Sequence, residues 1–116
     1  MKDWQNKGGG VLLRITLICN LGMSTSMLVD RIKEAAKAKG LSVDVDALPF
    51  DKAGDRFDST DILLLGPQVR YLMSKFKKDY AGKIAVIDTI NFTDYALING
   101  EKILNDALLK YEANKP

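Results

Sequence analysis

Residues 11–26 read VLLRITLICNLGMSTS and combine a buried strand, a loop and the entry to a helix. The segment Val11–Ile18 is short, mostly apolar and rich in β-branched side chains, which is typical of a central strand in a parallel sheet. Cys19 follows it directly. The apolar spacing of residues 27–39 predicts a helix that one of the hydroxyl residues 24–26 caps. The sequence therefore predicts a thiol at the junction between a strand and a helix.

The rest of the chain continues this alternation of strands and helices. Further strands are predicted at residues 41–48, 61–65 and 84–87, the last ending at Asp88, and a second helix follows Gly66-Pro67. A last helix begins at Asn99-Gly100, and its predicted inner face consists of Ile103, Leu104, Ala107, Leu108 and Tyr111. The pattern leaves two segments open: residues 49–60 form a loop or a short helix, and residues 89–98 form a connection of unassigned conformation.

This order of elements predicts an α/β fold, because right-handed crossovers turn it into a four-stranded parallel sheet with helices on both faces. Strand 41–48 alternates between apolar and polar residues, so we place it at an edge and expect the strand order 2-1-3-4. The switch point of such a sheet, where ligands bind, then lies between its first and third strands. We therefore expect Cys19 to face Gly66, Pro67 and Gln68 across the site.

Composition limits the domain organisation and the chemistry. The 116 residues suit one domain at 11–112, preceded by a flexible lead-in or expression remnant at 1–10 and followed by a frayed tail at 113–116. We expect a cytoplasmic protein, since no apolar run is long enough to span a membrane and a single cysteine fits a reducing compartment. A net charge of +2 gives no reason to expect nucleic-acid binding. The absence of histidine excludes Ser-His-Asp and Cys-His catalysis and, with one cysteine, makes a metal site unexpected.

The position of Cys19 supports a chemical role, although a lone cysteine is most often a small core residue. A thiol at a helix N-terminus has a lowered pKa and reacts as the thiolate. The backbone N–H groups of Leu21 to Ser26 can cradle an anion, helped by the dipole of the helix that follows. We interpret the loop as a site where sulfur takes a phosphoryl group. Simple capping by the hydroxyls, and an ordinary turn at Gly22, remain open as structural explanations.

The residue six positions after Cys19 distinguishes a carrier from a hydrolase. Cysteine phosphatases read C-x5-R-(S/T) in their loop, and their arginine stabilises the transition state of hydrolysis. Here Thr25 takes that position, and Ser26 follows. A phosphocysteine formed in this loop is therefore expected to persist until an acceptor arrives.

The eight residues Cys19-Asn20-Leu21-Gly22-Met23-Ser24-Thr25-Ser26 closely resemble the loop of the IIB component of the lactose/cellobiose (chitobiose) group of the phosphoenolpyruvate-dependent sugar phosphotransferase system. Typical members read C-x-x-G-M-S-T-S there. The resemblance continues in 64–69 (LLGPQV), 86–88 (VID) and 94–100 (DYALING), and covers nearly all of residues 11–111. One departure is Ala96, where such proteins often have glycine.

The resemblance implies a fold similar to that of low-molecular-weight cysteine phosphatases. It also implies that Cys19 accepts a phosphoryl group from a histidine of a IIA component and passes it to a sugar, such as the β-linked disaccharide cellobiose, held by a membrane-embedded IIC component. Asn20, Leu21, Gly22, Met23, Ser24, Thr25 and Ser26 would form the phosphate cradle, with Gly66, Pro67 and Gln68 as the neighbouring wall. The resemblance also implies that the protein uses no cofactor or metal and that it docks transiently to the permease. We expect a monomer. The alternatives are a cysteine phosphatase and a flavodoxin-like binding module without catalytic activity.

Overall fold

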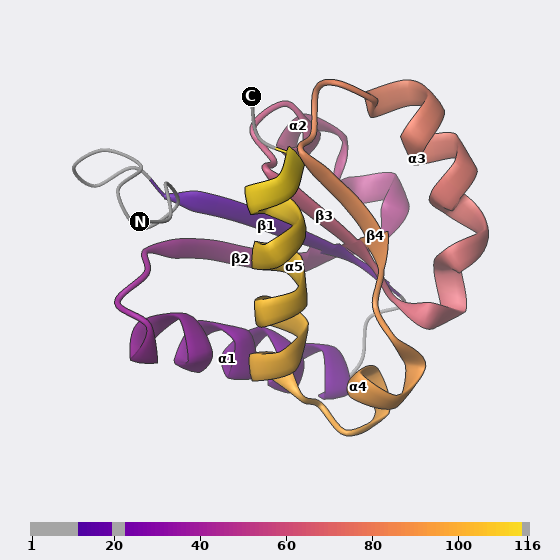
Figure 1. The fold of residues 1–116 in the computed structure, drawn as a ribbon. Helices are drawn as coiled ribbons and strands as arrows, with labels where there is room; N and C mark the ends of the chain where they lie inside the picture. The colour runs from indigo at the N-terminus through magenta and orange to yellow at the C-terminus, as the bar shows by residue number, and fades with distance from the viewer. Residues whose placement is uncertain (1–11, 20–22, 115–116) are drawn as a thin grey trace.

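The structure, a computed structural model, describes residues 12–19 and 23–114, with the backbone alone at Met23 and Ser24. Four strands form one sheet in which every neighbouring pair is parallel and the order is β2-β1-β3-β4 (Figure 1). The strands are β1 (Leu13–Ile18), β2 (Val43–Leu48), β3 (Ile62–Leu65) and β4 (Val86–Thr89). The predicted strand order and parallel sheet are confirmed. Val11, which the pattern assigns to the first strand, lies outside the described residues.

The helical elements follow the strands in the expected sequence. They are α1 (Met23–Ala38), η2 (Phe50–Lys52), α2 (Gly54–Phe57), η3 (Pro67–Leu72), α3 (Met73–Tyr80), α4 (Phe92–Ala96) and α5 (Gly100–Asn114). Thus the undecided segment 49–60 contains two short helical turns, and the segment 89–98 contains α4. Helix α5 includes residues 113 and 114, where the sequence pattern suggests a frayed tail. Among the described residues, no helix combines the length and the apolar character needed to cross a bilayer.

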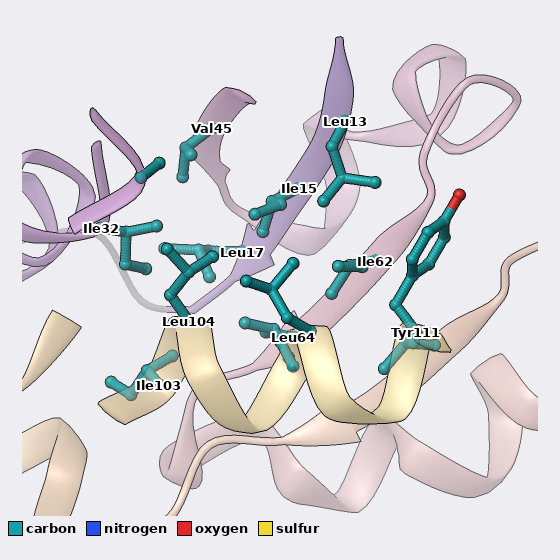
Figure 2. Packing of buried hydrophobic residues seen from close by; sticks show 14 of the residues in the cluster. Leu13, Ile15, Leu17, Ile32, Val45, Ile62, Leu64, Ile103, Leu104 and Tyr111 are labelled. Atoms are coloured by element: carbon teal, nitrogen blue, oxygen red, sulfur yellow. The ribbon is translucent and has the colours of Figure 1, made fainter. Parts of the chain in front are cut away.

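Alternation along the strands produces a core on each face of the sheet. Ile15 and Leu17 of β1 point to the face that α1 and α5 cover, where Ile103 and Leu104 of α5 meet them (Figure 2). The full predicted inner face of α5 is buried in this core: Ile103, Leu104, Ala107, Leu108 and Tyr111. Successive side chains of a strand point to opposite faces of the sheet. Because β1 has apolar residues at both sets of positions, both faces must be covered by helices.

The second core lies on the opposite face, under α2, η3 and α3. Ile18 of β1 and Leu63 and Leu65 of β3 pack there against Phe57 and Phe76. The Phe57 and Phe76 rings meet edge to face, with their centroids 5.2 Å apart. Edge-to-face packing is a favoured arrangement of aromatic pairs. The sheet is therefore a central layer between two layers of helices (Figure 1).

Helices α1 and α5 come into close contact at Gly100, the first residue of α5. A Cβ at Gly100 would lie 2.5 Å from the carbonyl carbon of Arg31 and 2.7 Å from the backbone nitrogen of Ile32. Both neighbours belong to the backbone of a helix and cannot move independently. Gly100 is therefore required by the close approach of the two helices.

A partly buried arginine joins α2 to the sheet. Arg56 donates from Nε to the hydroxyl of Thr16 at 2.8 Å and from Nη2 to the carbonyls of Ile15 and Asp44, each at 3.0 Å. The Thr16 and Thr60 hydroxyls are 2.8 Å apart, and the Thr60 hydroxyl donates to the Arg56 carbonyl at 2.7 Å. Since the Thr60 proton is used on that carbonyl, Thr16 donates to Thr60, and the network closes on Arg56.

Candidate functional site

Cys19 lies directly after β1, at the carboxyl edge of the sheet where β1 and β3 are neighbours. Ile18 pairs with Leu65 in register, and the backbone N–H of Gly66 donates to the carbonyl of Ile18 at 2.8 Å. The two strands therefore leave the sheet side by side, and Cys19 and Gly66 emerge from it together. This is the switch point that the strand order predicts.

Gly66 packs against the cysteine. A Cβ at this position would lie 2.9 Å from the Cys19 Cβ and 2.5 Å from Oε1 of Gln68. The backbone of Gly66 has φ −61° and ψ 153°, which any residue can adopt, so the requirement for glycine is steric. The structure thus brings Cys19, Gly66 and Gln68 together. Pro67 occupies the first position of η3, where its fixed φ suits a helical turn.

Gln68 connects the cysteine to a tyrosine of α4. Its Nε2 donates to the hydroxyl of Tyr95 at 3.1 Å, while its Oε1 would lie 2.5 Å from a Cβ added at Gly66, a position that is also close to the Cys19 Cβ. No local pattern in the sequence singles out Tyr95, because nothing in it shows that a side chain following β4 reaches one that follows β3. Pro67, Gln68 and Tyr95 also line an open hollow of about 560 Å³, together with Arg70, Tyr71 and Phe92.

The side chain of Thr25 contacts the thiol from helix α1. Its Oγ1 lies 3.5 Å from the Cys19 Sγ, within hydrogen-bond range for sulfur, and Thr25 is buried. Thr25 is the residue at the position where cysteine phosphatases have arginine. A neutral hydroxyl therefore faces the sulfur from that position.

The prediction of a lowered thiol pKa is wrong for this structure. Cys19 is only 3% exposed, and this burial raises the pKa of its thiol, while the hydrogen bond with Thr25 offsets the rise only in part. The physical reason is that a thiolate loses its hydration when it is surrounded by protein. The protonated thiol is consequently the resting form at neutral pH.

The predicted start of the first helix is also wrong. Helix α1 begins at Met23 and not at Met27, so residues 23–26 form its first turn and do not precede it as caps. The backbone N–H groups at a helix start have no acceptor within the helix, which is why this turn can still serve an anion. Ser26 is exposed, whereas Thr25 points inward. Asn20, Leu21 and Gly22 lie outside the described residues.

A second cavity, of about 430 Å³, lies between β4 and α5, and aspartates form part of its lining. Each of its aspartates has a lysine partner: Asp88 pairs with Lys110, and Asp94 and Asp106 both pair with Lys102. Asp88 also accepts from the backbone N–H of Thr89. Within the described part of the chain, no group of three or more acidic or cysteine side chains is arranged to hold a metal ion. These carboxylates therefore have structural partners, and the thiol site remains the candidate.

Comparison with known proteins identifies the family. Residues 14–106 match the model of the lactose/cellobiose-specific IIB subunit of the PTS system. The chain is 34% identical over 95 residues to the oligo-beta-mannoside-specific EIIB component of Bacillus subtilis, covering 82% of this chain and 92% of that protein. It is 35% identical over 95 residues to the galactose-specific EIIB component of Lactococcus lactis subsp. cremoris, covering 78% and 88%.

A solved structure agrees with these matches. The solution structure of the cellobiose-specific phosphotransferase IIB component from Borrelia burgdorferi superimposes with a TM-score of 0.74 and 34% identity, covering 92% of this chain and 98% of that one. The sequence relatives and this structure all belong to IIB components. The chain therefore belongs to the lactose/cellobiose-specific IIB family and is a phosphotransferase component of the sugar phosphotransferase system.

Proposed function

We propose that Cys19 carries the phosphoryl group: it accepts the group from a phosphohistidine of a IIA protein and delivers it to a sugar held by a membrane IIC permease. The observation that supports this most directly is the position of the thiol. Cys19 lies at the switch point of the sheet, against Gly66, and its Sγ is 3.5 Å from a hydroxyl in the first turn of α1. A phosphoryl group bonded to sulfur requires such surroundings, because a helix start and nearby backbone N–H groups stabilise its negative charge.

The transfer step balances without any further reactant. The Cys19 sulfur attacks phosphorus, the new S–P bond forms, and the N–P bond of the phosphohistidine breaks. The thiol proton passes to the departing imidazole nitrogen. A thiol whose pKa is raised by burial suits this order of steps. It stays protonated until the partner's phosphohistidine supplies both the phosphoryl group and the base that accepts the proton.

The phosphate cradle is proposed to be the loop and first helical turn, residues 20–26. The backbone N–H groups at the start of α1 supply the donors that three phosphoryl oxygens need, and Thr25 adds a hydroxyl beside the sulfur. Gly66, Pro67 and Gln68 form the opposite wall. The resulting phosphocysteine faces Thr25 where a phosphatase has arginine, so we expect transfer to an acceptor to be much faster than hydrolysis.

The sugar is proposed to be a β-linked disaccharide such as cellobiose. The relatives named above are components specific for oligo-beta-mannoside and galactose, and the related structure is that of a cellobiose-specific component. Since similar IIB chains serve different sugars, we expect the permease to select the sugar. The IIB protein would then meet both partners at the cytoplasmic face of the membrane.

The experiment is a phosphotransfer assay with purified IIA, the upstream phosphotransferase proteins and phosphoenolpyruvate. We expect the wild-type protein to gain one phosphoryl group with the acid and base lability of a thiophosphate ester. Cys19→Ser, which keeps the size and a polar group at that site, should gain none. Equal labelling of Cys19→Ser, or no labelling of the wild type by a IIA that phosphorylates a known IIB, would refute the proposal. An aryl phosphate serves as the phosphatase control, and no turnover of it is expected.

A further inference from the structure

The inference concerns Tyr95 and rests on the proposed function. Cys19 and Gln68 come together because Gly66 has no side chain. A Cβ added at Gly66 would lie 2.9 Å from the Cys19 Cβ and 2.5 Å from the Gln68 Oε1. The carboxamide of Gln68 is therefore next to the side chain that would carry the phosphoryl group. Gln68 itself is exposed, so packing alone does not hold its carboxamide in this place.

Tyr95 supplies the fixed point for that carboxamide. Its hydroxyl accepts from Gln68 Nε2 at 3.1 Å, while its ring packs against the core under α1 and α5. Helix α4, which carries it, is capped by Asn91, which accepts from the backbone N–H of Asp94 at 3.1 Å, and is joined to α5 by the pair between the Asp94 carboxylate and Lys102. An exposed glutamine has considerable rotamer freedom, and a hydrogen bond to an anchored hydroxyl restricts it.

The two ends of the carboxamide differ in a way that matters for an anion. The amide oxygen can only accept hydrogen bonds, and the amide nitrogen can only donate them, whereas a tyrosine hydroxyl does both. In the structure the oxygen lies against Gly66, whose missing side chain also makes room for Cys19, and the nitrogen bonds to Tyr95. A phosphoryl group on sulfur carries negative charge and is stabilised by donors, so the nitrogen end suits it better.

We propose that Tyr95 is a positioning residue that holds the Gln68 carboxamide beside Cys19 in both states of the carrier. When Cys19 becomes phosphorylated, the carboxamide turns about its last bond so that Nε2 donates to the phosphoryl group. The Tyr95 hydroxyl then donates to Oε1 instead of accepting from Nε2. The hydrogen bond between the two residues is kept and only its direction changes, so the exchange leaves no polar group unpaired.

The test compares Tyr95→Phe with Tyr71→Phe. Each variant removes one hydroxyl from the same hollow, but Tyr71 is 75% exposed and the structure places the hydroxyl of Tyr95, not that of Tyr71, on Gln68. With a phosphorylated IIA donor, we expect Tyr95→Phe to lower the equilibrium ratio of phosphorylated to free protein about fivefold, because in this variant the Gln68 side chain must become ordered at the phosphorylation step, whereas in the wild type Tyr95 already holds it. Tyr71→Phe should leave this ratio unchanged. Gln68→Glu, which can offer the phosphoryl group only acceptors, should lower it more than Tyr95→Phe does.

A spectroscopic readout separates positioning from a general loss of structure. The chain contains two glutamines, Gln5 and Gln68, so selective labelling of glutamine side-chain amides gives a simple NMR spectrum. The variant Gln68→Met identifies the pair of signals that belongs to Gln68. Phosphorylation of the wild type should shift these signals strongly, and in Tyr95→Phe they should be averaged in both states. The melting temperatures of the tyrosine variants are measured alongside.

The outcomes distinguish this inference from the proposed function. If the wild type is phosphorylated and Tyr95→Phe matches Tyr71→Phe in both the equilibrium ratio and the Gln68 signals, the role of Tyr95 is refuted and the carrier function stands. If the wild type takes no phosphoryl group from a competent donor, the proposed function fails and the inference fails with it. A selective loss in Tyr95→Phe with unchanged melting supports the inference.

Discussion

Replacing Gly66 with alanine tests how closely the wall of the site is fitted to the cysteine. The new methyl carbon would lie 2.5 Å from Gln68 Oε1 and 2.9 Å from the Cys19 Cβ. Two carbons attract at about 3.5–4.0 Å, so the second contact is strongly repulsive. The backbone at Gly66 has φ −61°, and alanine introduces no conformational strain there. Any effect of Gly66→Ala is therefore a measure of steric fit.

The two contacts differ in cost. Gln68 Oε1 is the end of a flexible, exposed side chain and can move aside. Cys19 follows β1 and is buried, so relief there requires a shift of the strand end or of η3. Overpacking of this kind costs about 1–3 kcal/mol. In a domain of this size, that corresponds to a fall in Tm on the order of 5–15 °C.

The functional effect should exceed the loss of stability. A misplacement of about 1 Å at a reacting group can lower a rate roughly a hundredfold, so we expect phosphorylation of Gly66→Ala to slow by one to two orders of magnitude. The assays are urea unfolding and the initial rate of labelling by phosphorylated IIA. Gly54→Ala is the matched control, because Gly54 has no atom within 4 Å of its added Cβ and its φ is not positive. It should be neutral or slightly stabilising.

A double variant assigns the effect to one of the two contacts. In a Gln68→Ala background the contact with Oε1 no longer exists, so most of the stability penalty of Gly66→Ala should remain if it comes from Cys19. If Gly66→Ala has the same urea midpoint and the same labelling rate as the wild type, the steric explanation is incorrect. Such a result would show that Cys19 is not tightly enclosed.

Three further predictions concern packing, the partly buried Arg56 and the thiol. Gly100→Ala should destabilise the protein by more than Gly66→Ala in urea unfolding, because its Cβ would meet backbone atoms of Arg31 and Ile32, at 2.5 and 2.7 Å, that cannot turn aside; wild-type stability would contradict this. Arg56→Met should cost about 3 kcal/mol, since it leaves the buried hydroxyl of Thr16 without its donor, and equal unfolding curves would disprove the role of the network. Alkylation of Cys19 should rise with pH along a curve displaced above that of an ordinary thiol, because burial raises its pKa. The folded state disfavours this thiolate. The free energy of unfolding should therefore fall as the pH rises from the ordinary thiol pKa of the unfolded chain to the raised pKa of the folded protein, and Cys19→Ser should lack that part of the fall.

Local patterns in the chain were enough to predict the architecture. The buried runs of β1 and β3 and the alternation of β2 specify which strands are central and which is at the edge, and parallel crossovers then leave few possible orders. The same reasoning predicts that Cys19 lies beside Gly66, because the carboxyl ends of neighbouring parallel strands meet at one edge. These features depend on hydrophobic periodicity and chain order, which a sequence displays directly.

Other features depend on which groups meet across space. The sequence alone determined the sheet order and the switch point at which Cys19 lies. Only the tertiary structure decided that the thiol is buried and its pKa raised, that Gln68 bonds to Tyr95, and that Arg56 from an undecided segment reaches the carbonyls of two strands. The physical reason is that desolvation and hydrogen bonding act over a few ångströms between residues far apart in the chain, so no local pattern records them.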